Sequence, residues 1–412
     1  MALAVRLRRP AGRRASAAMA AAAALAAAAV VTVPLAASAA PASNLPAAIG
    51  LKAYVYSGTG YTFTEGDGTY VQHLLDGRVI WFFSDSFLGA VGSDGSRGPS
   101  GMLHNQIVVQ DSPTASSASN FHNVWPNGWG TNSFAASGCA AEWPAASIQS
   151  ALNKVQVVLR CVDSGGNVIR LDLATLTINS GLTGWTVSID TTNFDSAARV
   201  QTPTCYPDTG NSEVEFGQSI MQLFGTTYIY GVQHCPNTVH AYVARVSGND
   251  LSQTGSWQYW DGSGKGWTAR SAGGEYGVAA MTSGGSPLIH AGSEYSVVYD
   301  SGRGVYRMIA TDLGLGPYID EYTATADPSG PWTFDGTIDN TQTDGVYGSK
   351  PASDPGSPCS LTTYGAKEQP AFETNGDIVF TYNVNVTGCS GSDAAAAYQA
   401  NVSNYDPRFN YG

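Results

Sequence analysis

The segment GDGTYVQHLLDGRVIWFFSDSF, residues 66–87, decides the fold. Two runs rich in apolar, aromatic and β-branched residues flank Asp76-Gly77, a dipeptide typical of two-residue hairpin turns. The segment therefore predicts a β-hairpin in which Leu75 pairs with Arg78. A hairpin of this kind followed by further short strand-like segments is typical of all-β folds.

Two aspartates lie at the open end of this hairpin. A two-residue turn places Asp67 opposite Ser86 and Asp85 opposite Gly68, so strict alternation points the two carboxyl groups to opposite faces of the hairpin. This alternation argues against a carboxylate dyad, but the run Trp81-Phe82-Phe83 breaks it, and a β-bulge before Ser84 would bring the two side chains together.

Asp67 is also the first of five carboxylates at a nearly constant interval. Successive members lie 73 to 79 residues apart, and each adjoins a short strand-like segment: Asp67, Glu142, Glu215, Glu294 and Glu368. A fixed period whose units read as several strands indicates a β-propeller. We therefore predict one domain over residues 51–412, a five-bladed β-propeller of four-stranded antiparallel blades that carries the five acids to a central funnel.

The fifth unit departs from this pattern. Its predicted inner strand is Ala371–Thr374, followed by the turn Asn375-Gly376, and no Trp-led outer strand follows. Residues 51–57 supply that strand in our prediction and close the ring, because closure removes free sheet edges.

The N-terminal segment and the cysteines indicate export. Residues 1–39 have the basic, apolar and Ala37-Ser38-Ala39 regions of a signal peptide, and residues 40–50 read as a short linker. We expect a secreted, extracellular protein. Six cysteines in an exported chain indicate disulfides, and pairing within blades gives Cys139–Cys161, Cys205–Cys235 and Cys359–Cys389.

Charge and composition narrow the partners. The net charge of −12 argues against nucleic acid and anionic membranes, and 21 Tyr and 9 Trp suit a neutral or cationic polysaccharide. No cysteine–histidine cluster has metal-ligand spacing, so we expect no cofactor, while a structural Ca²⁺ in the channel stays open. We expect a monomer.

Converging carboxylates suggest glycosidic bond hydrolysis, which needs one acid to protonate the leaving oxygen and a second as base or nucleophile. Asp67 is our candidate base or nucleophile, and the acid is Asp85 or Glu215, although Glu213 competes with Glu215 for the funnel. We predict eight further residues as substrate contacts: Glu142, Glu294, Glu368, His104, Asn105, Trp81, His234 and Asn383.

A family resemblance appears at these residues. The hairpin over residues 66–87, the GSEYSVVYD segment and GDIVFTYNVN together resemble actinobacterial five-bladed propeller hydrolases that include endo-D-arabinofuranosidases, glycoside hydrolase family 183. The order of acids is also similar to families 43 and 32. The resemblance implies roles for Asp67 as base or nucleophile, Glu142 in tuning pKa and orientation, and Glu215 as general acid. In the D-arabinan group the paired aspartates, here Asp67 and Asp85, are the telling feature.

We therefore predict a glycoside hydrolase that cleaves a furanose-rich polysaccharide, with D-arabinan of actinobacterial cell walls as the leading substrate. A non-catalytic carbohydrate-binding propeller has the same strands and many of the same acids. A sialidase requires an arginine triad, and the arginines show no such pattern.

Overall fold

The computed structural model describes residues 44–58, 62–98, 101–201, 213–235, 238–269, 278–283, 286–287, 292–312, 314–373 and 377–412. The predicted signal peptide, Cys205 and the Asn375-Gly376 turn lie outside these residues. Of the helices in the described part, none has the length and apolar character that a membrane span requires. The helices are α1 (Pro46–Ser57), α2 (Asp195–Ala198), α3 (Gly391–Ala400), η1 (Ala118–Asn120), η2 (Thr254–Ser256), η3 (Pro370–Phe372) and η4 (Val402–Asn404).

The described strands form five larger antiparallel sheets that follow one another along the chain. The first contains β2 (Tyr70–His73), β3 (Val79–Phe83), β6 (Gln106–Gln110) and β7 (Phe121–Val124). The second contains β8 (Ala141–Ala151), β9 (Lys154–Val162), β10 (Val168–Thr177) and β11 (Thr186–Asp190). The third contains β12 (Arg199–Gln201), β13 (Glu213–Leu223), β14 (Thr226–Cys235), β15 (Thr238–Ser247), β16 (Gln258–Trp260) and β17 (Trp267–Ala269).

The fourth sheet contains β20 (Tyr295–Asp300), β21 (Val305–Thr311), β22 (Tyr318–Ala324) and β23 (Thr333–Asn340). The fifth contains β24 (Ser360–Glu368), β25 (Val379–Thr387) and β26 (Pro407–Tyr411). Two small sheets complete the described strands: β1 (Phe63–Gly66), β4 (Ser86–Leu88) and β5 (Met102–Leu103), and the pair β18 (Thr282–Ser283) and β19 (Ser286–Pro287).

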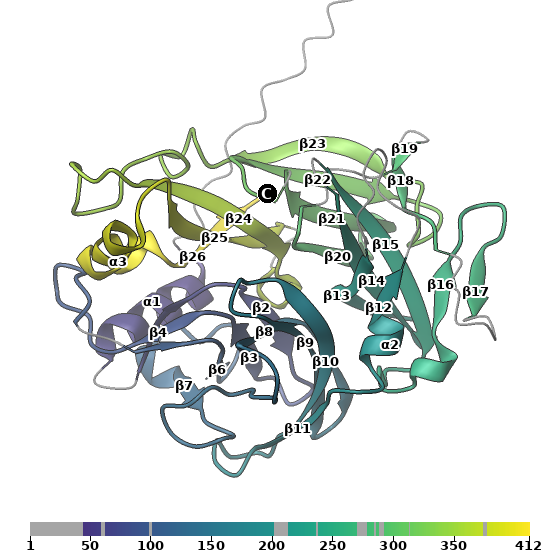
Figure 1. The fold of residues 1–412 in the computed structure, drawn as a ribbon, viewed down its shortest axis with the longest axis horizontal. Coiled ribbons are helices and arrows are strands. Elements are labelled where there is room, and N and C mark those ends of the chain that lie inside the picture. Colours follow the sequence, from purple (N-terminus) through teal and green to yellow (C-terminus); the bar gives the residue numbers. More distant parts are fainter. Residues whose placement is uncertain are drawn as a thin grey trace, which may run out of the picture. The chain divides into compact units, whose positions relative to one another are not determined.

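The five larger sheets surround a common centre (Figure 1). Neighbouring sheets meet through β2, β8, β13, β20 and β24, each of which contacts the next in chain order. The fifth sheet reaches back to the first, because the Lys367 ammonium donates to the Gly68 carbonyl at 2.9 Å and the Thr69 hydroxyl donates to Asn383 Oδ1 at 2.7 Å. This arrangement is consistent with a β-propeller and confirms the predicted all-β class.

The hydrophobic core lies between adjacent sheets, which is where each sheet buries its apolar faces. Phe82, Val157 and Phe216 belong to one cluster shared by the first three sheets. Tyr230 and Tyr295 belong to a second cluster, between the third and fourth sheets. Smaller clusters join the fourth sheet to the fifth, and α1 to the first.

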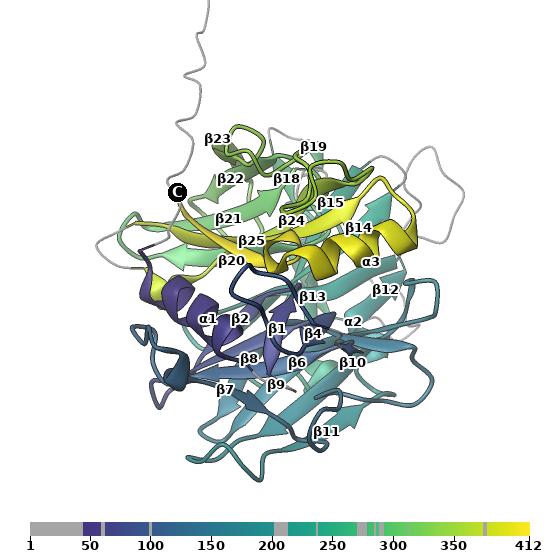
Figure 2. The same cartoon turned by 90° about the vertical axis from the view of Figure 1, so that its left-hand side faces the viewer.

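The predicted strand over residues 51–57 is wrong, because these residues belong to α1. Pro46 begins this helix at a position where a missing N–H costs nothing, and the alanines that follow favour helix. The predicted linker over residues 40–50 is wrong in its second half for the same reason, since Leu45, Ala47 and Leu51 are buried. Figure 2 shows α1 beside the first sheet.

The fifth sheet also differs from its prediction. Its innermost strand is β24, whereas Pro370–Phe372 forms η3, so the predicted strand Ala371–Thr374 is wrong over the described residues. Glu368 consequently ends an inner strand instead of preceding one. The third sheet has six described strands and the fifth has three, which corrects the prediction of four in every blade.

The first hairpin forms one residue out of the predicted register. Tyr70 pairs with Phe82, and the amide of Leu74 donates to the carbonyl of Arg78, so the loop has three residues. Gly77 supplies the positive φ of +92° that this loop requires. The turn remains where Asp76-Gly77 placed it, but the facing residues change.

Two of the three predicted disulfides are confirmed, Cys139–Cys161 and Cys359–Cys389. The first lies within the second sheet, and the second joins the start of β24 to the turn after β25. Cys205 of the third predicted pair lies outside the described residues.

Candidate active site

A cavity of about 520 Å³ opens where the first, second, fourth and fifth sheets meet. Asp67, Asp85 and Glu294 contribute carboxylates to its wall, and apolar and aromatic groups surround them. The lining also includes Met102, Trp143, Arg160, Leu315, Tyr364, Asn385, Tyr398 and Tyr405. Three of the six acids that the sequence singled out for chemistry or binding therefore share one pocket.

The backbone brings the two aspartates together. The amide of Asp67 donates to the carbonyl of Asp85 at 3.2 Å, and the amide of Ser84 donates to the carbonyl of Asp67 at 2.8 Å. Two residues, Ser84 and Asp85, therefore lie opposite one, which is the hydrogen-bond pattern of a β-bulge. The bulge sits where the broken alternation at Trp81-Phe82-Phe83 suggested it.

The two carboxyl groups have different partners. The Tyr364 hydroxyl donates to Asp67 Oδ2 at 2.5 Å, whereas the buried Asp67 Oδ1 accepts no hydrogen bond from the described residues. Asp85 Oδ1 lies 3.0 Å from His104 Nδ1 and accepts from Trp143 Nε1 at 3.1 Å. Asp85 is thus held in place by two side-chain partners, while Asp67 lines the cavity with one buried oxygen that has no such partner.

Burial changes the pKa of Asp67. Desolvation, followed by the nearby charge of Asp85, raises the pKa of Asp67 to about 7, although Tyr364 opposes this rise. A carboxyl group that is half protonated near neutral pH is suited to general acid–base catalysis.

Glu294 occupies a different electrostatic setting. It forms ion pairs with Lys367 and with Arg160, whose NH1 lies 3.3 Å from Oε1. Burial alone raises the pKa of Glu294, but these two cations outweigh burial and lower it. Arg160 also donates to the Tyr70 hydroxyl at 3.1 Å and to Gln218. Glu294 is therefore a fixed anion in a network of residues on, or next to, strands of all five larger sheets.

Glu215, the third catalytic candidate, lies on β13 and does not line the cavity. It is half-buried; desolvation raises its pKa, which the charges of Arg160 and Arg199 lower in part. Its neighbour Glu213 pairs with Arg199 at 2.8 Å, so of the two glutamates Glu215 is the one electrostatically linked to Arg160.

Glu142 lies outside this cavity. It is buried on β8 beside Asp172, and burial and that neighbouring carboxylate raise its pKa to about 8. Oxygen and sulfur atoms of Glu142, Asp172, Cys139 and Cys161 gather within 4.8 Å of one another. Both cysteines are used in a disulfide, and the thiolate is the form that binds metals, so this cluster is a poor metal site.

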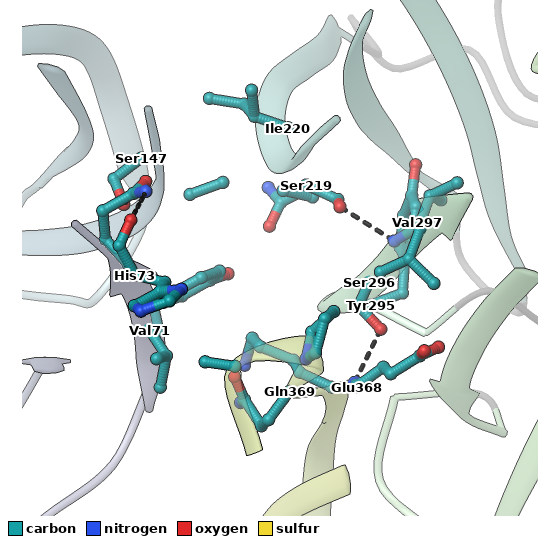
Figure 3. Close-up of a pocket in the computed structure, with 18 residues that line it drawn as sticks. Val71, His73, Ser147, Ser219, Ile220, Tyr295, Ser296, Val297, Glu368 and Gln369 are labelled. Atoms are coloured by element: carbon teal, nitrogen blue, oxygen red, sulfur yellow. Dashed lines mark hydrogen bonds between the residues drawn. The ribbon is translucent and has the colours of Figure 1, made fainter. Parts of the chain in front are cut away.

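Glu368 faces a second cavity, of about 250 Å³, in the central channel. Figure 3 shows that side chains from all five innermost strands surround this space, among them His73, Ser147 and Ser219. The Glu368 carboxylate pairs with Arg307 and its amide donates to Ser296 Oγ at 2.7 Å. Because β24 ends at Glu368, the residue is carried away from Asp67.

The remaining predicted contacts divide between site and scaffold. His104 contacts Asp85 as described above. Asn105 is buried and bonds to the backbone of Phe134 and Glu142. Trp81 is fully buried and stacks on Phe372.

Asn383 and His234 lie on the second strands of their sheets. Asn383 is buried against Thr69, directly beneath the loop that holds Asp67. His234 is exposed near the end of β14 and is not among the residues that line the cavity.

Sequence reasoning missed several members of the site. Tyr364 and Lys367 lie on the unrecognised strand β24, and Tyr398 and Tyr405 come from the last segment of the chain. The Tyr405 hydroxyl donates to the Asp85 carbonyl at 3.2 Å. Alternating residues of β24 were the available signal, because Thr362 and Tyr364 both line the cavity.

Comparison with known proteins gives a family and a fold. The chain belongs to the family described as a domain of unknown function (DUF5005), whose model matches residues 52–411. No curated protein matches the chain. A crystal structure of a protein from Bacteroides ovatus assigned as a hydrolase is similar to it, with a TM-score of 0.62, 20% identity and coverage of 87% of each chain.

Two weaker likenesses are to glycoside hydrolases. The α-L-arabinofuranosidase PaAbf62A from Podospora anserina has a TM-score of 0.41 and 13% identity, covering 85% of this chain and 91% of that one. A family 117 glycoside hydrolase from Zobellia galactanivorans has a TM-score of 0.43 and 10% identity, covering 84% of each. Scores this low carry no weight for fold or function.

Proposed function

As a member of the DUF5005 family with a carboxylate pair in a cavity, this protein is, we propose, a secreted five-bladed β-propeller glycoside hydrolase. The observation that carries the proposal is the pairing of Asp67 with Asp85 across the bulge, with Glu294 in the same wall. The fold shared with the Bacteroides ovatus hydrolase supports it.

The chemistry we propose follows from the raised pKa of Asp67. Asp67, with its pKa raised to about 7, holds the proton and delivers it to the leaving glycosidic oxygen. Asp85, held in position by His104 and Trp143, acts as the nucleophile on the anomeric carbon. This exchanges the roles expected from sequence, because burial falls mainly on Asp67. Glu215 remains a second candidate for the acid.

The stereochemical outcome we propose is retention. Asp67 and Asp85 adjoin each other across the β-bulge, and the charge of Asp85 contributes to the raised pKa of Asp67, so the two carboxyl groups are close neighbours. Carboxyl groups about 5–5.5 Å apart suit a covalent glycosyl-enzyme intermediate, whereas inversion needs about 6.5–9.5 Å. Asp85 then forms the bond to the anomeric carbon as the C–O bond breaks, and water hydrolyses that ester with Asp67 as base.

The lining favours an uncharged sugar. Arg160 is the one lysine or arginine among the described residues that line the cavity, and Glu294 neutralises it. An anionic substrate such as a sialic acid or a uronate therefore finds no unpaired cation there. Tyr398, Trp143 and Leu315 offer flat or apolar surface, which sugar rings contact through their C–H faces. A furanose-rich neutral polymer, D-arabinan first, is our proposed substrate.

Product analysis tests this proposal. The protein is incubated with arabinogalactan, lipoarabinomannan, L-arabinan, levan and xylan, and soluble products are separated by chromatography. We expect oligosaccharides from the arabinan-containing polymers. Binding to one of the polymers without any products would replace hydrolysis by a non-catalytic carbohydrate-binding function.

A further inference from the structure

A third cavity, of about 570 Å³, lies on the outer side of the first and second sheets, away from the carboxylate pair. Its wall combines β7 and the loop after it with residues 182–185 before β11, and Tyr54 of α1 closes one side. We call it the tryptophan groove, because Trp125, Trp129 and Trp185 all line it.

Trp129 is the most exposed part of this groove. Its relative exposure is 72%, an unusual position for so large an aromatic residue. Gly128 and Gly130 flank it with φ of +110° and +71°, conformations that glycine adopts without strain. The backbone is therefore shaped to turn sharply on both sides of this one side chain.

The loop that carries Trp129 is held in place. Thr131 Oγ1 donates to the Gly128 carbonyl at 2.7 Å, and Asn127 Nδ2 donates to the Ser133 carbonyl at 3.0 Å. On the groove wall, the Tyr54 hydroxyl donates to Asn123 Oδ1 at 2.7 Å and accepts from the Asn123 amide at 3.0 Å. A ligand that stacks on Trp129 therefore meets a surface that is already ordered, which reduces the entropy cost of binding.

The lining also specifies the chemistry of the occupant. It contains no aspartate, glutamate, lysine or arginine among the described residues; the polar groups belong to His122, Asn123, Thr183 and Tyr54. Aromatic rings interspersed with neutral donors and acceptors match a ligand that has C–H faces and hydroxyl groups. The lining residues themselves therefore offer no carboxylate, ammonium or guanidinium group to a charged peptide or a nucleic acid, although Arg78 contacts the Trp185 ring and Asp111 contacts His122 from outside the lining.

The groove is connected to the catalytic cavity through the same loop. Asn132, three residues after Trp129, accepts from the His104 amide at 2.9 Å, and His104 Nδ1 contacts Asp85. A single rigid segment therefore supports both sites.

We propose that the tryptophan groove binds a neutral polysaccharide chain and holds a polymer on the enzyme while the cavity cleaves it. This inference rests on the proposed function for its ligand class. The inference predicts that Trp129 contributes to the binding of long substrates and not of short ones, because an oligosaccharide that occupies only the catalytic cavity does not reach Trp129.

Affinity gel electrophoresis tests the inference with the five polymers named above. The Asp67→Asn background prevents consumption of the polymer. Trp129→Ala in that background is compared with Trp129→Phe, which keeps an aromatic ring, and with Phe224→Ala. The last is a matched control, because Phe224 is 90% exposed on the turn between β13 and β14, outside the groove.

We expect Trp129→Ala to weaken binding of at least one polymer by tenfold or more, with Trp129→Phe largely retaining it and Phe224→Ala unchanged. In the active background, Trp129→Ala lowers kcat/KM on that polymer but not on a short oligosaccharide. The inference is overturned if every polymer retards Trp129→Ala and Phe224→Ala equally. It is also overturned if no polymer retards the Asp67→Asn protein that carries neither of these substitutions.

Two further outcomes separate the explanations. If gel filtration shows that Trp129→Ala converts a dimer to a monomer, a second copy of the chain covers the groove and the inference is wrong. If the wild type cleaves none of the polymers but its retardation still depends on Trp129, the groove is confirmed and the proposed hydrolase function fails.

Discussion

The substitution Asp67→Asn should change how the stability of the protein depends on pH. The folded-state pKa of Asp67 is raised from 3.8 to about 7. A carboxyl group with a raised folded-state pKa binds its proton more tightly in the folded chain, so the wild type loses stability as pH rises from about 4 to about 7. Asparagine has no proton to lose and keeps the hydrogen bond from Tyr364.

The size of the effect follows from the two pKa values. Between pH 5 and pH 7 the unfolded carboxyl group is ionised while the folded one is mostly protonated, so stability falls by about 1.4 kcal/mol per pH unit. From pH 5 to pH 8 the free energy of unfolding of the wild type should therefore fall by about 2–3 kcal/mol relative to Asp67→Asn. The other buried acids are common to both proteins and cancel in this difference.

Urea unfolding at pH 5 and pH 8 measures the difference. Asp76→Asn is the control: Arg78 lowers the pKa of exposed Asp76, so this carboxylate is ionised in both the folded and the unfolded chain throughout the window. Its substitution should give the same stability change at both pH values. A difference below about 0.5 kcal/mol for Asp67→Asn, close to the Asp76→Asn value, would refute the assignment of a raised pKa to Asp67.

Two further predictions concern the partners of the site and the scaffold. Tyr364→Phe removes the hydroxyl that stabilises the Asp67 anion, so the pKa of Asp67 should rise further. The alkaline limb of the pH–rate profile should then move to higher pH. An unchanged alkaline limb argues against Asp67 as the titrating group. The double substitution Cys359→Ser and Cys389→Ser removes a disulfide between cysteines 30 residues apart. The free energy of unfolding, measured in urea, should fall by about 2–4 kcal/mol. A loss below about 1 kcal/mol would show that this disulfide restrains the unfolded chain little.

Local sequence signals predicted the all-β class, the first hairpin and the place of its turn. They did not predict its register, because Asp76-Gly77 fits both a two-residue and a three-residue loop, and the choice moves every facing pair by one residue. In the observed register, a bulge at Ser84 places Asp67 beside Asp85. The signal in the sequence that indicated this neighbourhood was the broken alternation at Trp81-Phe82-Phe83, because the turn alone predicted that the two side chains point to opposite faces.

The fifth sheet was misread for a physical reason. Residues 371–380 combine Asn-Gly with flanking apolar residues and resemble a hairpin, whereas β24 contains Gly365 at φ +63° and few apolar residues in alternation. The strongest hairpin signal therefore fell beside the true inner strand. Residues 51–57 have the β-branched and aromatic residues of a strand, yet Pro46 and the alanines before them begin a helix that packs on the core.

Long-range members of the site are not visible in a single sequence. Tyr364 reaches Asp67 across 297 residues, and Tyr405 reaches Asp85 across 320. Neither tyrosine belongs to a motif with chemical meaning. Their roles arise only when the fifth sheet closes against the first.

The central claim is that Asp67 and Asp85 form the catalytic pair, and the rates of their variants test it most directly. Initial rates of arabinan hydrolysis are measured for the wild type, Asp67→Asn, Asp85→Asn and Glu215→Gln, with circular dichroism as a check of folding. The account predicts that each aspartate variant loses a factor of about 10²–10⁴ or more, while Glu215→Gln loses much less. Near-wild-type hydrolysis by folded Asp67→Asn or Asp85→Asn would contradict it.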